Sequence, residues 1–558
     1  MPTNLEISLA IQTTTPKGTS LVPGVLKTRK YDVVIVGAGA AGTATAISAA
    51  EHGASVLLMD QGHGGGSSRL SGGIVYAGGG TKYQKAAGYE DTPENMFNYL
   101  KLECEGAVDD ETLRKFCNDS IDNLDWLEKC GARFSESLSP HKLGYPAERH
   151  YLYYSGNEEA YPYNQAAFPV PRGHRTLAPH LASGATLWAA LTQRAKELGV
   201  EMLPLARADQ VVVEDGRVKG LKYRVMPKTA RGFKMHQRLN SVGAKLLNWV
   251  PPVGKAMANH ADKLWDRTAE PHVVETNAIV LSAGGFVFNQ DMVRQYNKKA
   301  EGTSPLGNKG DDGSGIRLGV EVGGQVSHME NVAMWRFLSP PEAFLRGIAV
   351  GPDGQRIINE DLYGVHFTEA MANKTGGRGF LIVDSATFNL ARQTFKDELH
   401  RITAAQAYYT LFWGYSKANS LDLLAQKLGI SAEGLRSTVA AYNTGIRCGT
   451  GDPFHKARKY SVPISQGPFY GIDVSIRPSL LHSVPAITMG GLKVEGKTGL
   501  VLSKSGDAIP GLYAAGRNAV GIPSRNYLSG LSLADCIFSG RRAGKHAATT
   551  RYEEQRTS

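Results

Sequence analysis

The chain has 558 residues, more than one compact core holds, so we expect at least two domains with separate interiors. With 42% hydrophobic and 20% charged residues, its composition is that of an ordinary soluble globular protein. The net charge of +10 would suit nucleic acid, anionic lipid or an acidic substrate, but no basic run interleaved with aromatic residues resembles a nucleic-acid-binding module, so no nucleic-acid partner is expected.

The cysteines and the N-terminus bear on the compartment. Five scattered cysteines form no CxxC pair and no His-Cys cluster at zinc spacing, so we expect reduced thiols in a cytoplasmic protein and no metal site. Residues 1–29 are expected to be an N-terminal extension. They lack the positive start and apolar core of a secretory signal, so no such signal is expected. No uninterrupted apolar run has transmembrane length.

Residues 31–60 have the pattern of a strand, a glycine turn, a helix and a second strand that ends in an acid. Gly37 permits the tight turn, Gly39 lets the backbone approach a pyrophosphate, and Gly42 lets helix and strand pack closely. The helix N-terminus meets the phosphates, and Asp60 is placed to accept a ribose hydroxyl. We therefore predict that this unit binds the ADP half of a dinucleotide, with further contacts from Ala40, Ala41 and Gln61.

Three later segments favour FAD over NAD as that dinucleotide. Residues 64–73 are poor in side chains, which suits backbone contact with a long cofactor. Residues 278–285 and 511–518 read as strands that end on glycine, and residues 529–535 open a helix whose N-terminus can stabilise negative charge on a flavin. The expected FAD contacts in and between these segments are Ser67, Ser68, Ser71, Gly72, Gly73, Ala208, Ala283, Gly284, Gly516, Arg517, Gly530, Ser532 and Leu533.

The cofactor domain is therefore predicted to be discontinuous. We expect an α/β fold in which residues 30–300 and 469–558 form a Rossmann-like FAD-binding domain of the glutathione-reductase type. Between these two parts, residues 301–468 are expected to form an inserted α+β catalytic cap domain over the flavin.

Together the segments resemble the flavoprotein family that contains fumarate reductases and 3-ketosteroid dehydrogenases. The resemblance covers nearly the whole chain, from about Tyr31 to Gly544. Besides the two ends, it includes Tyr154-Ser-Gly-Asn-Glu158, Gly310-Asp-Asp-Gly313-Ser-Gly315, Arg356-Ile-Ile-Asn359-Glu360 and Thr488-Met-Gly490-Gly491.

The C-terminal loop separates the branches of this family. Fumarate-reductase-like members typically have Asn-Arg-Leu-Gly-Gly-Asn there, whereas residues 523–530 of this chain are Pro-Ser-Arg-Asn-Tyr-Leu-Ser-Gly. With Tyr363 of the cap, Tyr527 and Ser529 resemble the Tyr and Tyr-x-Ser set of the 3-ketosteroid Δ4-(5α)-dehydrogenases. The Δ1-dehydrogenases tend to have Tyr-Pro-Gly, which this chain lacks. The resemblance implies an oxidoreductase that acts on a 3-ketosteroid and passes electrons through FAD to an external acceptor.

By the same resemblance, Tyr527 polarises the ketone, Ser529 takes the alpha proton and Tyr363 passes it on, while flavin N5 accepts a hydride. Each residue has a structural alternative, because Tyr363 would also serve to pack the cap and Ser529 to cap a helix. The alternative functions are a 3-ketosteroid Δ1-dehydrogenase, a fumarate- or urocanate-type reductase, and a non-catalytic flavin-containing partner in membrane or electron-transfer complexes.

Other charged residues are expected to have structural roles. Arg525 and Arg356 would suit a carboxylate-binding reductase, but we expect Arg525 to shape its loop and Arg356 to lie at the surface or at a strand end. His174 is expected to be structural. Some relatives bind FAD covalently through a histidine just before the Ser-Gly-Gly segment, where this chain has Arg69 and Leu70, so we expect non-covalent FAD.

Residues 227–268 are an insertion that the cofactor domain does not need. They contain eight Lys or Arg against two acids. Apolar residues recur among them at helical spacing until Pro251: Met235, Leu239, Val242, Leu246 and Trp249, followed by Met257, Leu264 and Trp265. A basic amphipathic helix with tryptophan suits an anionic membrane interface, so we predict peripheral contact with the inner face of the cell membrane. The alternative is that the apolar stripe packs on its own domain or on another subunit.

Overall fold

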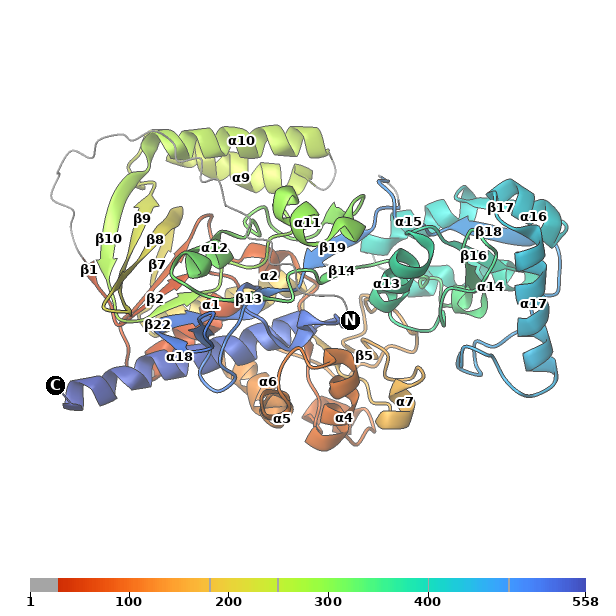
Figure 1. Cartoon of the computed structure of the whole chain (residues 1–558), viewed down its shortest axis with the longest axis horizontal. Coiled ribbons are helices and arrows are strands. Elements are labelled where there is room, and N and C mark those ends of the chain that lie inside the picture. Colours follow the sequence, from red (N-terminus) through yellow and green to blue (C-terminus); the bar gives the residue numbers. More distant parts are fainter. Residues whose placement is uncertain (1–28, 180–181, 248–249, 400, 480–481, 558) are drawn as a thin grey trace, which may run out of the picture.

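The computed structural model describes residues 29–179, 182–247, 250–399, 401–479 and 482–557. A central six-stranded sheet lies on one side of the molecule, and a lobe of helices around a smaller sheet lies on the other (Figure 1). The strands of the central sheet follow the order β21 (Leu500–Leu502), β22 (Ala508–Ala514), β11 (Ile279–Leu281), β2 (Val33–Val36), β3 (Val56–Asp60) and β7 (Glu201–Pro204).

Five of these strands run parallel, and β21 alone is antiparallel to its neighbour. β2 is buried throughout, which accounts for its unbroken apolar sequence. The C-terminal segment returns to this sheet, since Leu512 of β22 lies opposite Ile279 of β11. The structure is thus a mixed helix and strand fold in which the two ends of the chain share one sheet.

Helices α1 (Ala40–Glu51) and α18 (Leu531–Thr557) lie side by side beneath the sheet (Figure 1). Their contact depends on glycine, because a Cβ at Gly540 would lie 2.5 Å from the Ala41 carbonyl oxygen and one at Gly544 would lie 2.3 Å from that of Thr45. Close approach of the two backbones therefore joins the N-terminal and C-terminal segments.

The segments between β3 and β11 surround the central sheet. They are α2 (Gly66–Leu70), β4 (Ile74–Tyr76), α3 (Lys82–Ala86), α4 (Pro93–Cys104), α5 (Asp110–Asn118), α6 (Ser120–Lys129), β5 (Leu152–Tyr153), α7 (Tyr163–Ala166), β6 (Gly173–Arg175), α8 (Ser183–Glu197), β8 (Ala206–Glu214), β9 (Arg217–Val225) and β10 (Glu270–Glu275). The last three are antiparallel to one another, and β1 (Arg29–Lys30) adds to β10 in parallel; the resulting sheet packs its apolar face on the central one.

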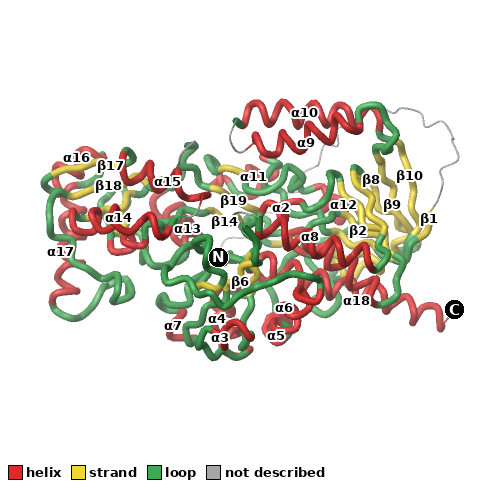
Figure 2. The backbone as a smooth tube through the Cα atoms, turned by 180° about the vertical axis from the view of Figure 1, so that it is seen from behind, coloured by secondary structure: helices red, strands yellow, loops and turns green. Residues whose placement is uncertain are grey.

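The opposite lobe is built on the sheet β15 (Ile348–Val350), β16 (Phe380–Val383), β18 (Phe469–Asp473) and β17 (Tyr415–Ala418). Its helices, seen most clearly in Figure 2, are α13 (Gly364–Thr375), α14 (Ser385–Glu398), α15 (Arg401–Phe412), α16 (Leu421–Leu428) and α17 (Ala432–Arg447). The elements that link the two sides are α11 (Gln290–Tyr296), β12 (Ser304–Pro305), α12 (Ser314–Glu321), β13 (Val326–Ser327), β14 (Val332–Met334), β19 (Pro485–Thr488) and β20 (Gly491–Leu492).

Arg356 corrects one expectation from the sequence. Its side chain is only 4% exposed and pairs with Glu360 and Asp452, and Lys456 lies 3.0 Å from the Glu360 carboxylate. The surface position expected for Arg356 is therefore wrong, whereas the strand-end alternative holds, because its backbone bridges to Val350 at the end of β15. Arg356 belongs to a buried ion network within the lobe. The turn-like residues before it did not indicate this burial.

The insertion between β9 and β10 forms a helical hairpin of α9 (Phe233–Leu247) and α10 (Pro251–Thr268), which projects at the top of Figure 1. The helical spacing predicted for α9 is confirmed, and Pro251 opens α10. Trp265 is fully buried, with its indole N–H 2.8 Å from the Leu205 carbonyl oxygen. For this tryptophan the alternative holds, because it packs on its own domain; Trp249 lies outside the described residues.

In the described segments, no helix combines the length and the apolar character needed to cross a membrane. All five cysteines are free thiols, and Cys448 alone among them is exposed.

We predict that Trp265 fixes the hairpin to the body of the protein. Trp265→Ala removes a fully buried indole and its hydrogen bond, so the free energy of unfolding in urea should fall by about 3–5 kcal/mol. Trp413, 73% exposed, is the matched control, and Trp413→Ala should change stability by less than about 0.5 kcal/mol. Equal losses in the two variants would contradict the packing role.

Candidate active site

The glycine turn lies at the carboxyl end of β2, at the N-terminus of α1. Gly37 has φ +105°, and a Cβ there would lie 2.5 Å from the Ser282 carbonyl oxygen. A Cβ at Gly42 would lie 1.8 Å from the Gly37 carbonyl oxygen. Both positions are therefore closed to larger residues by the protein itself, as the predicted tight turn and close helix packing require.

Gly39 differs from these two glycines. A Cβ there would meet only the Ser68 hydroxyl, at 3.5 Å, so open space lies in front of this backbone. Ser68 also accepts a hydrogen bond from the N–H of Ala40, at 3.0 Å. A pyrophosphate could approach Gly39 closely, and the N-terminal amides of α1 provide the positive end that such an anion needs.

The residues after β3 hold the edge of this site. The carboxylate of Asp60 accepts hydrogen bonds from the N–H groups of Ala38 (2.9 Å) and Gly62 (2.7 Å), so it also braces the glycine turn. Gln61 donates to the Gly310 carbonyl at 3.2 Å. Ala208 lies in β8, opposite Tyr223 of β9.

Asp311 connects three of the expected cofactor segments. Its carboxylate accepts hydrogen bonds from Ser67 (2.6 Å) and Arg517 (2.7 Å), and a Cβ at Gly284 would lie 2.0 Å from it. Burial lowers the pKa of Arg517, but the Asp311 charge outweighs it and raises that pKa overall. Asp311 belongs to one of the family motifs in the sequence but was not predicted to be a site residue.

Polar atoms without partners mark the same place. Arg517 Nη1 and both side-chain amide atoms of Asn518 are buried, with no hydrogen-bond partner among the described residues. Buried polar groups are rarely left in this state, so a polar ligand is expected to satisfy them. This observation, with the open space at Gly39, shows that the residues present fit a dinucleotide cofactor.

The other expected contacts border the same site. Ser71 accepts a hydrogen bond from the N–H of Gly73 at 3.2 Å, and the Gly72 carbonyl accepts one from Tyr145 at 2.9 Å. Ala283 follows β11, and Gly516 follows β22, with Ala41 and Cys536 against it. Gly530, Ser532 and Leu533 lie at the start of α18. The strands β2, β11 and β22 thus bring their carboxyl ends and following turns together.

A cluster of hydroxyl groups lies at the beginning of α18. Ser529 is buried, and its Oγ accepts a hydrogen bond from Tyr153 Oη at 2.6 Å. Ser529 also contributes, as a hydrogen-bond partner, to the pKa of Tyr363. The indole N–H of Trp335 lies 3.3 Å from Tyr363 Oη. The structure therefore brings Tyr363 and Ser529 together although 165 intervening residues separate them in the sequence.

The phenols of this cluster are protonated donors at neutral pH. Burial raises the pKa of Tyr527 to about 12, with the Arg517 charge acting in the opposite direction. Burial also raises the pKa of Tyr363 and that of Tyr153. The hydroxyls can therefore donate hydrogen bonds to a carbonyl oxygen or carry protons in a chain, but none of them is a stable base.

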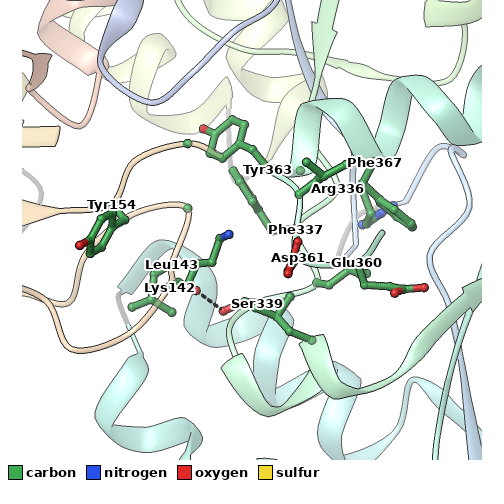
Figure 3. A pocket seen from close by; sticks show the side chains of 16 residues that line it. Lys142, Leu143, Tyr154, Arg336, Phe337, Ser339, Glu360, Asp361, Tyr363 and Phe367 are labelled. Atoms are coloured by element: carbon green, nitrogen blue, oxygen red, sulfur yellow. Dashed lines mark hydrogen bonds between the residues drawn. The ribbon is translucent and has the colours of Figure 1, made fainter. Parts of the chain in front are cut away.

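Aromatic rings form the wall beside these hydroxyls. The Trp335 ring meets the Tyr527 ring edge-on at 4.9 Å, and the Phe337 ring meets that of Tyr363 at 5.4 Å. Ala333, Val365, Ile487 and Met489 complete this apolar cluster. A pocket of about 30 Å³ lies next to Tyr363, with Lys142 and Asp361 on its wall (Figure 3). The arrangement suits a flat apolar molecule with one carbonyl group.

Two structural alternatives can be compared with the structure. Tyr363 does pack in an apolar cluster, as its structural alternative expects, and its hydroxyl also accepts a hydrogen bond from the Trp335 indole N–H, so packing and a place in the hydroxyl cluster coexist. The helix α18 begins at Leu531, which puts Gly530 and not Ser529 at its N-cap.

Tyr153 is the site residue that sequence reasoning missed. The family motif was read from Tyr154, whose ring lies against that of Tyr89. Side chains alternate across an extended segment, so Tyr153 points to the opposite side, toward Ser529. From the sequence, Tyr153 could have been identified only by predicting that residues 153–158 run as an extended segment next to the catalytic loop.

The remaining residues singled out by sequence have structural positions. His174 is buried between the Arg172 carbonyl (3.0 Å) and the Thr81 hydroxyl (2.9 Å), and burial lowers its pKa to about 4. Arg525 pairs with Glu105 and Glu369, each at 3.0 Å, and so holds the loop before Tyr527. The structural roles expected for His174 and Arg525 agree with these contacts.

We predict different outcomes for two glycines of the turn. Gly39→Ala should fold with an unchanged melting temperature in the cofactor-free state, because the methyl group meets only Ser68, but its affinity for FAD should fall at least about tenfold. Gly37→Ala should instead lower the melting temperature itself, because its Cβ collides with backbone. Calorimetry of the cofactor-free protein and titration with FAD measure both. Wild-type FAD affinity in Gly39→Ala would contradict the close approach.

Residues 32–533 match the family described as FAD binding domain. The 3-oxo-5-alpha-steroid 4-dehydrogenase of Comamonas testosteroni is 37% identical over 499 residues, which cover 87% of this chain and 92% of that protein. A cytochrome-type fumarate reductase of Shewanella frigidimarina is 26% identical over 527 residues, which cover 93% of this chain and 77% of that protein.

Among solved structures, 3-ketosteroid-delta4-(5alpha)-dehydrogenase from Rhodococcus jostii, in complex with 4-androstene-3,17-dione, is similar to this chain with a TM-score of 0.77. Its sequence is 29% identical, and the match covers 93% of this chain and 97% of that one. Since the family match spans residues 32–533 and the relatives are flavin oxidoreductases, this chain belongs to the FAD-binding family of oxidoreductases, with FAD as its cofactor.

Proposed function

We propose that this chain is an FAD-dependent 3-ketosteroid dehydrogenase that introduces the C4–C5 double bond into 3-keto-5α-steroids. The observation that carries the proposal is the hydroxyl cluster of buried Tyr363 and Ser529 and half-buried Tyr527, set against an aromatic wall. Arg517, one of the expected FAD contacts, is near enough for its charge to act on the pKa of Tyr527. Similarity to the Comamonas and Rhodococcus steroid dehydrogenases supports the same activity. The electrons leave FAD for an external acceptor.

The cofactor assignment extends to individual residues. In our proposal Gly39 and Ala40 receive the pyrophosphate, Asp60 the ribose, and Arg517 with Asn518 the flavin side of the cofactor, without a covalent link. The proposed cofactor domain is Rossmann-like, of the glutathione-reductase type, and consists of residues 30–300 and 469–558. Residues 301–468 form the proposed cap. β18 (Phe469–Asp473) still pairs with β16 of the cap sheet, so the chain re-enters the cofactor domain a few residues after 468.

FAD, when bound, supplies a hydride acceptor at N5. The chain's own hydroxyls handle the carbonyl and the proton. Tyr527, a protonated phenol, donates a hydrogen bond to the C3 ketone and so makes the proton at C4 more acidic. Ser529 takes that proton within a hydrogen-bonded relay, since an isolated serine is a weak base. Tyr363 passes it onward.

One alternative, a carboxylate reductase, fits these contacts less well. A fumarate- or urocanate-type reductase needs free cations that clamp a carboxylate, whereas Arg525 is already paired with Glu105 and Glu369. A Δ1-dehydrogenase would use the same phenols on the other side of the ketone. Analysis of the steroid product separates the C4–C5 from the C1–C2 double bond.

We predict that three substitutions spare the cofactor and stop the chemistry. Tyr527→Phe, Ser529→Ala and Tyr363→Phe should each purify with FAD, yet slow the bleaching of flavin absorbance by a 3-keto-5α-steroid by about 10²–10⁴-fold, because each removes a donor or relay hydroxyl. Tyr442→Phe is the matched control, since that tyrosine is buried in the far lobe and its hydroxyl has no partner among the described residues. Rapid bleaching in the Tyr527 variant would remove it from the mechanism.

We also propose that the α9–α10 hairpin contacts an anionic membrane surface, from which an apolar steroid would be collected. Charge complementarity supports this occupant, because the exposed basic residues of the insertion are Lys228, Arg231, Lys234, Arg238, Lys255, Lys263 and Arg267. Four apolar side chains are exposed among them: Met235, Val242, Val250 and Val253. Basic residues around exposed apolar side chains are typical of helices that lie in a membrane interface.

The membrane proposal predicts a composition-dependent result. Replacing Met235, Val242 and Val253 together by serine should reduce co-sedimentation with vesicles that contain phosphatidylserine several-fold, while turnover of dissolved steroid stays unchanged. Serine at Phe168 and Leu423, which are exposed elsewhere, provides the control. Equal sedimentation of the wild type with neutral and anionic vesicles, or of the wild type and the triple variant, would refute membrane contact through this hairpin.

A further inference from the structure

A buried carboxyl group lies next to the hydroxyl cluster and has no assigned role. Glu158 is 1% exposed. Its Oε2 accepts a hydrogen bond from the N–H of Gly156 at 2.8 Å, whereas its Oε1 is buried without a partner among the described residues. A half-satisfied buried carboxyl group is costly to the fold, so its presence calls for an explanation beyond packing.

The segment that carries Glu158 is bound to both catalytic segments. Tyr153 donates to the Ser529 hydroxyl at 2.6 Å, and the Ser155 carbonyl accepts from the N–H of Ser529 at 3.1 Å. Asn157 Oδ1 accepts from the N–H of Tyr363 at 2.6 Å. Because three hydrogen bonds fix this segment, the carboxyl group of Glu158 has a defined position relative to Ser529 and Tyr363.

Other unpartnered polar atoms accompany Glu158. Tyr76 Oη, Ser155 Oγ and Arg172 Nη1 are buried without partners among the described residues. Tyr76, Arg172 and Glu158 are close enough for their charges to affect one another's pKa values, and Ser155 lies against Gly173, the residue after Arg172. Several such atoms from different strands in one interior are usually bridged by ordered water.

The pocket in Figure 3 lies between Tyr363 and the segment that carries Glu158. Gly156, which holds the Glu158 carboxylate, and Tyr363 are both on its wall, and its volume of about 30 Å³ is enough for about two water molecules. A water there can receive a proton from the relay and deliver it to Glu158. Glu158 does not itself line the pocket, but it lies near enough to Tyr363 for its charge to help raise the pKa of that phenol, so one water behind Gly156 would connect the hydroxyl cluster to the carboxylate.

The charges around Glu158 leave it able to titrate. The facing titratable groups are Arg172, Lys142 and the phenols Tyr76, Tyr99, Tyr154 and Tyr363. Arg172 is already neutralised by Asp91, through hydrogen bonds of 2.9 Å from Nε and Nη2. Burial therefore prevails over the attraction of Arg172 and raises the pKa of Glu158 to about 7. The phenols, in contrast, stay protonated.

We propose that Glu158 is the proton acceptor at the end of the relay that begins at Ser529. This inference rests on the proposed steroid dehydrogenation. The C4–H bond breaks and its proton goes to Ser529 Oγ, whose own proton passes to Tyr363, then to water and to the Glu158 carboxylate. The electron pair left at C4 forms the C4–C5 double bond as the hydride leaves C5 for FAD. Glu158 becomes a neutral acid and later loses the proton to solvent.

The test measures flavin bleaching by a 3-keto-5α-steroid under anaerobic conditions across a range of pH. In the wild type the rate should rise with pH and level off above about 7, because the acceptor must be ionised. Glu158→Gln should keep FAD, slow bleaching at high pH by about 10²-fold, and abolish the rise with pH. Glu159→Gln is the matched control, since that neighbour pairs with Lys459 at 2.9 Å, away from the cluster, and should behave as wild type.

Glu158→Asp provides a second variant in case the glutamine variant fails to fold. It keeps an ionisable group but withdraws it by one methylene, so the rate should fall while the rise with pH remains. A wild-type rate and pH profile in either Glu158 variant would overturn the relay and leave the proposed function standing. Absence of bleaching in the wild type would instead overturn the proposed function, and the relay with it.

Discussion

The architecture depends on the close approach of backbone at the carboxyl end of β2. A Cβ at Gly42 would collide with the Gly37 carbonyl, and one at Gly540 with that of Ala41, so α1 is held against the turn on one side and against α18 on the other. Because α18 follows directly on the loop with Tyr527 and Ser529, this packing sets the distance between the cofactor turn and the reactive hydroxyls. The contact is between elements about 500 residues apart, and it is made by residues without side chains.

The second constraint is that the reactive site is built from neutral groups. Burial keeps Tyr153, Tyr363 and Tyr527 protonated, which favours binding of an apolar ketone but leaves no strong base in contact with it. A charged base beside the aromatic wall would carry a large desolvation cost. In our proposal the charge belongs instead to Glu158, which lies behind the hydroxyls in an interior with unpartnered polar atoms. The charge is then apart from the substrate, and the hydroxyls only carry protons.

The sequence was informative where local geometry is encoded in residue type. The glycine spacing at 37–42 predicted the turn and the buried strands around it, and the helical spacing in 227–268 predicted α9, because both patterns depend on neighbouring residues. It failed where the answer depends on distant partners. Arg356 follows a turn-like stretch, yet Glu360 and Asp452 bury it, and Trp265 resembles an interfacial residue until Leu205 is seen to accept its N–H. Tyr153 was hidden for the same reason, since only the return of the chain at Ser529 gives its hydroxyl a partner.

The hairpin is coupled to the cofactor edge and is not a free appendage. Asp262 of α10 pairs with Arg207 of β8 at 2.8 Å and also with Lys309, the residue before Gly310. Gly310 accepts the hydrogen bond of Gln61, which follows Asp60 at the end of β3. A force on α10 would therefore reach the end of β3, next to Asp60, through two ion pairs and one hydrogen bond. Since exposed ion pairs are individually weak, the burial of Trp265 against Leu205 must provide most of the rigidity of this link.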